Sequence, residues 1–199
     1  MNKRYFHHLL VQLHKVSAWV FVALVVASIA VSAVALRNNN AGSVDLRAQL
    51  LEVDKQNGDV ETSLKQLREY TYSHMNSSLA TENAPYPPIQ LKYRYERLVS
   101  AEKARVSEAN SKLATAAQNH CEALIPAGRS LNRIECIQNY MTTNGVKENS
   151  IPDSIYKFDF ADPVWSPDLA GWSVLVSIVL SLVLLVRTSL ILWLRHQLS

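Results

Sequence analysis

The sequence contains little cysteine and little glycine: two Cys and five Gly in 199 residues. So few glycines leave little material for the flexible loops that cradle phosphate groups, and no GxGxxG, P-loop or GxSxG pattern occurs. The two cysteines form no CxxC pair, and no HExxH pattern is present. We therefore expect no enzyme activity, no bound metal and no cofactor.

Charged residues are absent from two long apolar segments. Residues 16–36 are uncharged over 21 positions, and residues 169–186 are uncharged over 18. Because about 20 apolar residues suffice to cross a bilayer as a helix, we predict transmembrane helices at 16–36 and 169–194. The alternative for the first segment is a cleaved signal peptide ending near Ala33-Val34-Ala35. Its length and the 15-residue tail before it favour a retained anchor.

Acidic residues are absent from both ends of the chain. All 17 Asp and Glu lie within residues 45–168, whereas the tails carry only basic charges: Lys3, Arg4, Lys15, Arg187 and Arg195. Positively charged flanks mark the cytoplasmic side of a membrane protein. We expect an amphipathic tail at 1–15 and a short tail at 195–199 in the cytoplasm, with 37–168 outside the cell membrane. The basic charges lie beside the bilayer, so lipid, and not nucleic acid, is the implied partner.

The cysteine pair flanks a predicted break between two helices. Pro126 and Gly128 both interrupt helices, and apolar residues at helical spacing resume over 130–141. Two helices joined by a short loop run antiparallel, and an oxidising compartment favours disulfides. We therefore predict a Cys121–Cys136 disulfide, worth about 3 kcal/mol of loop-closure entropy. Free thiols, or a metal site that recruits further ligands, are the alternatives.

The outside segment is mostly of helical character. Residues 37–43 are polar and contain Gly, which predicts a linker. Apolar residues recur at helical spacing through 44–145, with a proline-rich interruption at 81–88. The longest run, 89–125, is either one rod or a kinked helix, and residues 146–168 are predicted to be irregular. The fold expected is an all-α membrane protein, in which two transmembrane helices flank an extracytoplasmic antiparallel bundle of three or four helices with one disulfide.

Small residues recur along both apolar segments. Such faces allow close helix packing, either between copies or membrane partners, or simply between the two segments of one chain. These residues are Ala23, Ala27, Ser28, Ser32, Ser173, Ser177 and Ser181. Aromatic and basic residues near the second segment are predicted to lie at the membrane interface, namely Trp165, Trp172 and Arg187.

Aromatic and basic residues are concentrated in the stretch YRYER. Arg94 and Arg97 are suited to hold an anionic ligand through paired hydrogen bonds, with Tyr93 or Tyr95 stacking on it. His74 is a candidate for the opposite wall of such a pocket. The alternative is that Tyr95 packs in a helix seam and the arginines pair with neighbouring acids.

Two resemblances accompany these patterns. HMNSSL (74–79) and PIQLKYRYER (88–97) resemble stretches of uncharacterised two-span membrane proteins of Saccharibacteria-type bacteria. Two spans around a helical domain are also similar in plan to the four-helix ectodomains of bacterial chemoreceptors. That second resemblance implies ligand sensing, although we expect no cytoplasmic signalling domain after the second span.

Two functional hypotheses follow. The first is a structural or assembly subunit of a cell-envelope complex, acting as a homo-oligomer or with other membrane proteins. The second is a ligand- or peptide-binding sensor module that signals through a separate membrane partner.

Overall fold

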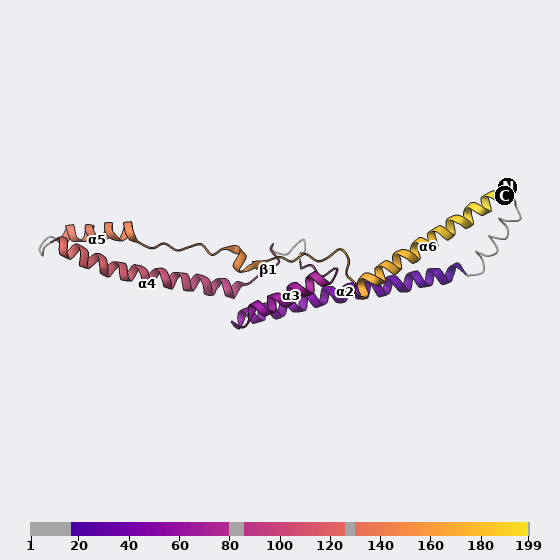
Figure 1. The fold of residues 1–199 in the computed structure, drawn as a ribbon, viewed down its shortest axis with the longest axis horizontal. Coiled ribbons are helices and arrows are strands. Elements are labelled where there is room, and N and C mark those ends of the chain that lie inside the picture. Colours follow the sequence, from indigo (N-terminus) through magenta and orange to yellow (C-terminus); the bar gives the residue numbers. More distant parts are fainter. Residues whose placement is uncertain (1–16, 80–85, 126–129, 199) are drawn as a thin grey trace. The chain divides into compact units, whose positions relative to one another are not determined.

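The computed structural model describes residues 17–79, 86–125 and 130–198. Within these ranges the chain forms five α-helices, one short 3-10 helix and two very short strands (Figure 1). It divides into two compact units. Unit 1 contains Met1–Glu52, Asp59–Pro88 and Asp159–Ser199, and unit 2 contains Val53–Gly58 and Ile89–Phe158. The described chain is therefore mainly helical, as predicted.

Helix α2 runs from Ala18 to Lys55 without interruption. The prediction of a linker at 37–43 is wrong, because this stretch is helical. Asparagine and glycine weaken a helix by up to about 1 kcal/mol each, but here the helix is held by tertiary contacts. Ser43 is fully buried, and a Cβ atom at Gly42 would collide with the ring and hydroxyl of Tyr70. Gly42 thus lets Tyr70 approach the α2 backbone.

Helix α3, Val60–Ser73, belongs to unit 1. Asp59 caps its start by accepting a hydrogen bond from the Thr62 backbone N–H at 3.1 Å. Its buried residues recur at helical spacing, as the sequence predicts, and are Val60, Leu64, Leu67 and Thr71. A hydrogen bond of 3.3 Å from the Tyr70 hydroxyl to the Asn39 carbonyl ties the end of α3 to α2.

Helix α6 runs from Leu169 to Leu198. Asp168 caps its start and accepts a hydrogen bond from the Gly171 backbone N–H at 2.9 Å. Ser166 donates to Asp168 at 2.8 Å. Gly171 is needed at this tight start, because a Cβ atom there would collide with the Ser166 carbonyl.

Both α2 and α6 contain a stretch long and apolar enough to cross a membrane. Only 11% of the apolar window in α2 and 17% of that in α6 is buried within the protein. A core helix of a soluble protein would bury most of such a window, so the apolar side chains here face outward.

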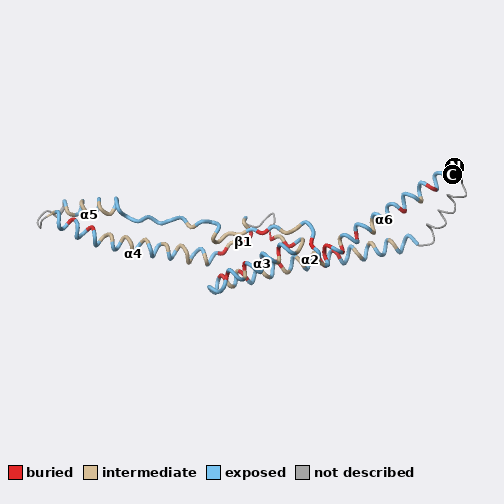
Figure 2. Tube along the Cα trace, in the orientation of Figure 1, coloured by how far each residue is buried: buried red, intermediate tan, exposed pale blue. Residues whose placement is uncertain are grey.

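Unit 2 is built on a helical hairpin. Helix α4 is one continuous rod, Lys92–Leu124, and α5 is Ser130–Asn144. The predicted disulfide between Cys121 and Cys136 is confirmed, with 6.0 Å between the Cα atoms. Figure 2 shows that little of this hairpin is buried; Ala117 and Cys121 are the buried residues of α4.

After α5 the chain returns in an extended form along α4. It passes through the 3-10 helix η1, Asp153–Ile155, into strand β2, Lys157–Phe158, which pairs antiparallel with β1, Ile89–Gln90. Ile89, which we expected to begin the long helix, is therefore in a strand, and α4 begins at Lys92. The prediction of a single bundle of three or four helices is not confirmed, because α3 lies in unit 1 while α4 and α5 lie in unit 2.

Candidate functional site

The start of α4 is organised by one buried carboxylate from the last turn of α2. Asp54 is 1% exposed. It accepts hydrogen bonds from the backbone N–H groups of Tyr93 at 3.0 Å and Arg94 at 2.8 Å. Arg97 donates from Nη2 to the same carboxylate and from Nη1 to the Asp54 carbonyl, both at 2.8 Å. A helix N-terminus attracts negative charge, so Asp54 both caps α4 and fixes Arg97.

This arrangement agrees only in part with the alternative prediction for the YRYER stretch, because Arg97 pairs with an acid of the same chain that lies 43 positions away and is not a neighbour. The anion held by Arg97 and the start of α4 is Asp54 of the same chain. Tyr95 packs on Tyr156, with 4.6 Å between ring centroids. His74 lies in unit 1, whereas Tyr93, Arg94, Tyr95 and Arg97 lie in unit 2. The structure therefore describes no single pocket that contains all five residues.

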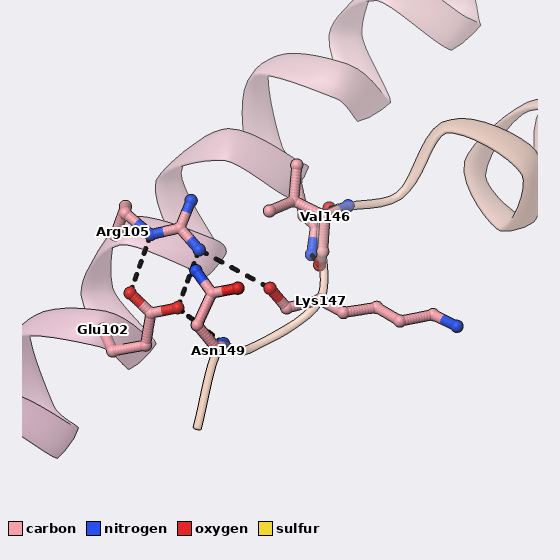
Figure 3. Close-up of polar contacts among 6 residues, drawn as sticks. Glu102, Arg105, Val146, Lys147 and Asn149 are labelled. Atoms are coloured by element: carbon pink, nitrogen blue, oxygen red, sulfur yellow. Dashed lines mark hydrogen bonds and ion pairs between the residues drawn. The ribbon is translucent and has the colours of Figure 1, made fainter. Parts of the chain in front are cut away.

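A second polar cluster holds the extended segment that follows α5. We name residues 145–151 the strap. Asn110 of α4 pairs with Val146 in both directions: its Nδ2 donates to the Val146 carbonyl at 3.1 Å, and its Oδ1 accepts the Val146 N–H at 2.9 Å. The Asn149 N–H donates to Glu102 Oε1 at 2.7 Å. Figure 3 shows the part of this cluster around Glu102, in which side chains of α4 bind the backbone of Asn149 and Lys147.

Glu102 is the centre of this cluster. Arg105 donates to both of its carboxylate oxygens, from Nε at 2.8 Å and from Nη2 at 2.7 Å. Hydrogen bonds from Arg105, followed by that from the Asn149 backbone, lower the pKa of Glu102 from its usual 4.5 to about 2. Arg105 also reaches the Lys147 carbonyl at 3.5 Å. The carboxylate is therefore ionised at any physiological pH.

A recess of about 200 Å³ lies between α4 and the strap in unit 2. It is lined by Tyr95, Val99, Glu102, Glu148, Asn149, Ser150 and Ile151. Its lining thus combines an aromatic ring, aliphatic side chains and two carboxylates.

In unit 1, a polar junction connects the end of α3, the middle of α2 and the start of α6. Asn39 donates from Nδ2 to Asp168 at 2.7 Å and to the Met75 carbonyl at 3.1 Å. The Met75 N–H donates to Ser166 Oγ at 3.0 Å. His74 stacks on Tyr70, with 4.1 Å between ring centroids. These contacts place His74 in a structural junction.

The charge of Asp168 is maintained in this junction. Burial alone raises the pKa of its carboxyl group, but hydrogen bonds from Gly171, Asn39 and Ser166, and the nearby His74, leave the pKa below its usual value. Asp168 can therefore cap α6 as an anion near neutral pH.

The two apolar helices contact each other through serine side chains. Ser32 of α2 and Ser177 of α6 are hydrogen-bonded at 3.2 Å. Each hydroxyl also lies within hydrogen-bond distance of a carbonyl of its own helix, Ser28 for Ser32 at 2.9 Å and Ser173 for Ser177 at 2.8 Å, so one of the two donates to the other helix while the other donates within its own. Ser32 and Ser177, two of the predicted small packing residues, therefore contact each other within one chain.

The remaining small residues are placed differently. Ser181 donates to the Ser177 carbonyl at 2.7 Å, and Ser173 is buried, whereas Ala23 and Ala27 are exposed on α2. Their use in packing against another chain stays a prediction.

The expected interfacial residues all lie in unit 1. Trp165 and Trp172 contact each other edge-on, with 5.8 Å between ring centroids, and both are exposed. Arg187 is only 8% exposed, and its guanidinium lies 4.9 Å from the Phe21 ring centroid. Arg187 therefore takes part in the contact between α2 and α6, and its position relative to lipid stays a prediction.

Apart from the disulfide, the sequence did not identify the residues that hold unit 2 together. Asp54 is distant from α4 in the sequence, and nothing in its local context indicates that it caps that helix. Glu102 and Arg105 stand three residues apart, a spacing typical of a helical ion pair, yet the strap that they hold has no sequence signature. Among the residues that the structure describes, no group of three or more His, Cys, Asp or Glu could hold a metal ion.

Comparison of the chain with protein-family models, with curated proteins and with solved structures finds no match.

Proposed function

We propose that this protein is a membrane-anchored, non-enzymatic subunit that helps to assemble a cell-envelope complex. The observation that carries the proposal is the poor burial of α4. This helix has 33 residues, of which Ala117 and Cys121 are buried. Helices in proteins gain most of their stability from packing an apolar face, so a long, disulfide-linked and largely uncovered hairpin is suited to contact another protein.

The proposal includes a membrane topology. Both termini are cytoplasmic, α2 and α6 cross the bilayer, and residues 37–168 are outside. Three features support this arrangement: the outward-facing apolar windows, the restriction of acids to residues 45–168 and the disulfide, which is typical of oxidising compartments. The partners are further copies of this chain or other membrane proteins.

Site-specific photocrosslinking in native membranes tests the assembly function. A photoreactive residue at Ser111, which is exposed on α4, is expected to give discrete adducts of defined mass. The control position is Val26, which is exposed on the apolar part of α2 and is expected to react mainly with lipid. Absence of protein adducts from Ser111 and from other exposed α4 positions would argue against an assembly role.

The recess between α4 and the strap favours a second candidate function, the ligand- or peptide-binding module. In that case a bound ligand, and not a constitutive partner, contacts unit 2. A ligand-dependent rise in melting temperature of the purified chain, without any α4 crosslinks, would favour this function over assembly.

A further inference from the structure

The recess between α4 and the strap has the size and lining of a site for one side chain. Its volume of about 200 Å³ is below the roughly 300–1,000 Å³ of pockets that hold drug-sized ligands. Val99 and Ile151 provide aliphatic walls, and Tyr95, whose ring also packs on Tyr156, is 39% exposed as a residue. A long alkyl chain fits such walls.

The charged side chains that line the recess are both acidic, and one of them, Glu102, is already paired with Arg105. Two of the lining residues, Glu102 and Glu148, are acidic, and none is lysine or arginine. Among the described residues Glu148 has no hydrogen-bond or ion-pair partner. The Lys147 side chain extends away from Glu102 in Figure 3. An exposed aromatic ring beside unneutralised carboxylate is favourable for a cation.

We propose that this recess binds a cationic alkyl group, the ammonium or guanidinium end of a lysine- or arginine-like side chain. The alkyl stem lies along Val99 and Ile151, the Tyr95 ring contacts the cation, and Glu148 pairs with it. Glu102 completes the site as a positioning residue, because its bonds to Arg105 and Asn149 fix the strap wall. The inference concerns unit 2 alone and does not depend on the proposed assembly function or on membrane sidedness.

The test uses the full chain in lipid nanodiscs, with the Tyr95 ring followed by NMR. The probes are N-acetyl-lysine methylamide and the matched norleucine compound, which has a similar chain without the charge. The lysine probe is expected to shift the Tyr95 signal in a saturable manner, and the norleucine probe is not. Equal shifts with both probes, or no saturable shift with the lysine probe, would overturn the proposal.

Two variants locate the binding. Glu148→Gln is expected to weaken the lysine probe about threefold, the size of effect typical of an exposed ion pair. Glu96→Gln, which removes an exposed carboxylate of α4 outside the recess, is the matched control and should leave the affinity unchanged. Equal affinity for the wild type and Glu148→Gln would contradict the assignment of Glu148.

A further arm of the same experiment identifies the source of the cation. n-Pentylamine presents a single alkylammonium group without a peptide backbone. Binding of n-pentylamine as tight as that of the lysine probe supports a free amine as ligand, and tighter binding of the lysine probe supports a side chain of a partner protein.

Discussion

Three aspartates accept hydrogen bonds from the first turns of three helices. Asp59 and Asp168 cap the helices that they immediately precede, α3 and α6. Asp54 caps α4 from a different helix. The caps by Asp59 and Asp168 are local, whereas the cap by Asp54 joins the end of α2 to the start of α4.

Replacement of Asp54 tests this role at the scale of one residue. Asp54→Ala is expected to lower the unfolding free energy of unit 2 by about 2 kcal/mol or more, since it removes a helix cap and the buried partner of Arg97. Denaturant unfolding followed by circular dichroism measures the loss. Asp45→Ala, an exposed acid in the same helix, should change the value by less than about 0.5 kcal/mol, and equal losses for both variants would contradict the account.

The strap predicts a specific pH dependence. The pKa of Glu102 is about 2 in the folded chain, below the usual 4.5, so the unfolded chain binds a proton at higher pH than the folded chain. Stability from this contact is complete above pH 4.5, declines as the pH falls and is lost as the pH passes through about 2. The chemical shift of the Asn149 amide in NMR should change as protonation of Glu102 weakens its hydrogen bond to this amide.

The variant Glu102→Gln supplies the matching measurement. It is expected to shift the Asn149 amide signal at neutral pH in the direction that acid produces in the wild type. A strap signal that is identical in the variant and in the wild type at pH 7 would show that Glu102 does not hold this segment.

At the scale of secondary-structure elements, the start of α6 depends on a glycine. Gly171→Ala places a Cβ atom against the Ser166 carbonyl, and such overpacking typically destabilises a protein by about 1–3 kcal/mol. Unfolding in mixed micelles checks this loss. Gly58→Ala is the control, because the nearest atom to its Cβ would be a Val53 methyl group at 3.2 Å, a much milder contact than that at Gly171. A larger effect at Gly58 than at Gly171 would be contrary to expectation.

The hairpin of α4 and α5 depends on its disulfide. The double variant with Cys121→Ser and Cys136→Ser is expected to lose about 3 kcal/mol of unfolding free energy, by the loop-closure entropy of a fifteen-residue loop. Thermal melting of the wild type with and without reductant provides the comparison. An unchanged melting temperature after complete reduction would mean that the hairpin is stable without its covalent link.

Elements with local signals could be predicted from the sequence. The apolar stripe of α3, the break before α5 and the disulfide all follow from residues close to one another in the chain. The continuation of α2 through 37–43 could not be predicted, because weak helix formers there are stabilised by Tyr70, about thirty positions later. The partner of Arg97 was missed for the same reason: Asp54 lies 43 positions before it.

For the candidate site, the sequence supplied residue types but not their partners. The YRYER stretch suggested a site for an anionic ligand. In the structure, the carboxylate of Asp54 is the anion that Arg97 and the start of α4 bind. The recess depends on an extended strap, whose contacts with α4 pass mainly through its backbone atoms and therefore leave no pattern in its side chains.

At the scale of the whole molecule, sidedness is the central claim. Acids confined to the middle of the chain, basic residues at both ends and a disulfide between the two apolar helices support one compartment for residues 37–168 and another for both termini. The assembly function requires that α4 lie on the extracytoplasmic side of the membrane.

Labelling of Ser111→Cys with a membrane-impermeant maleimide in intact spheroplasts tests this claim most directly. Rapid labelling at position 111 is expected without detergent, whereas a cysteine in a C-terminal tag should be labelled only after the membrane is opened. Labelling of the tag, but not of position 111, in intact spheroplasts would contradict the claim.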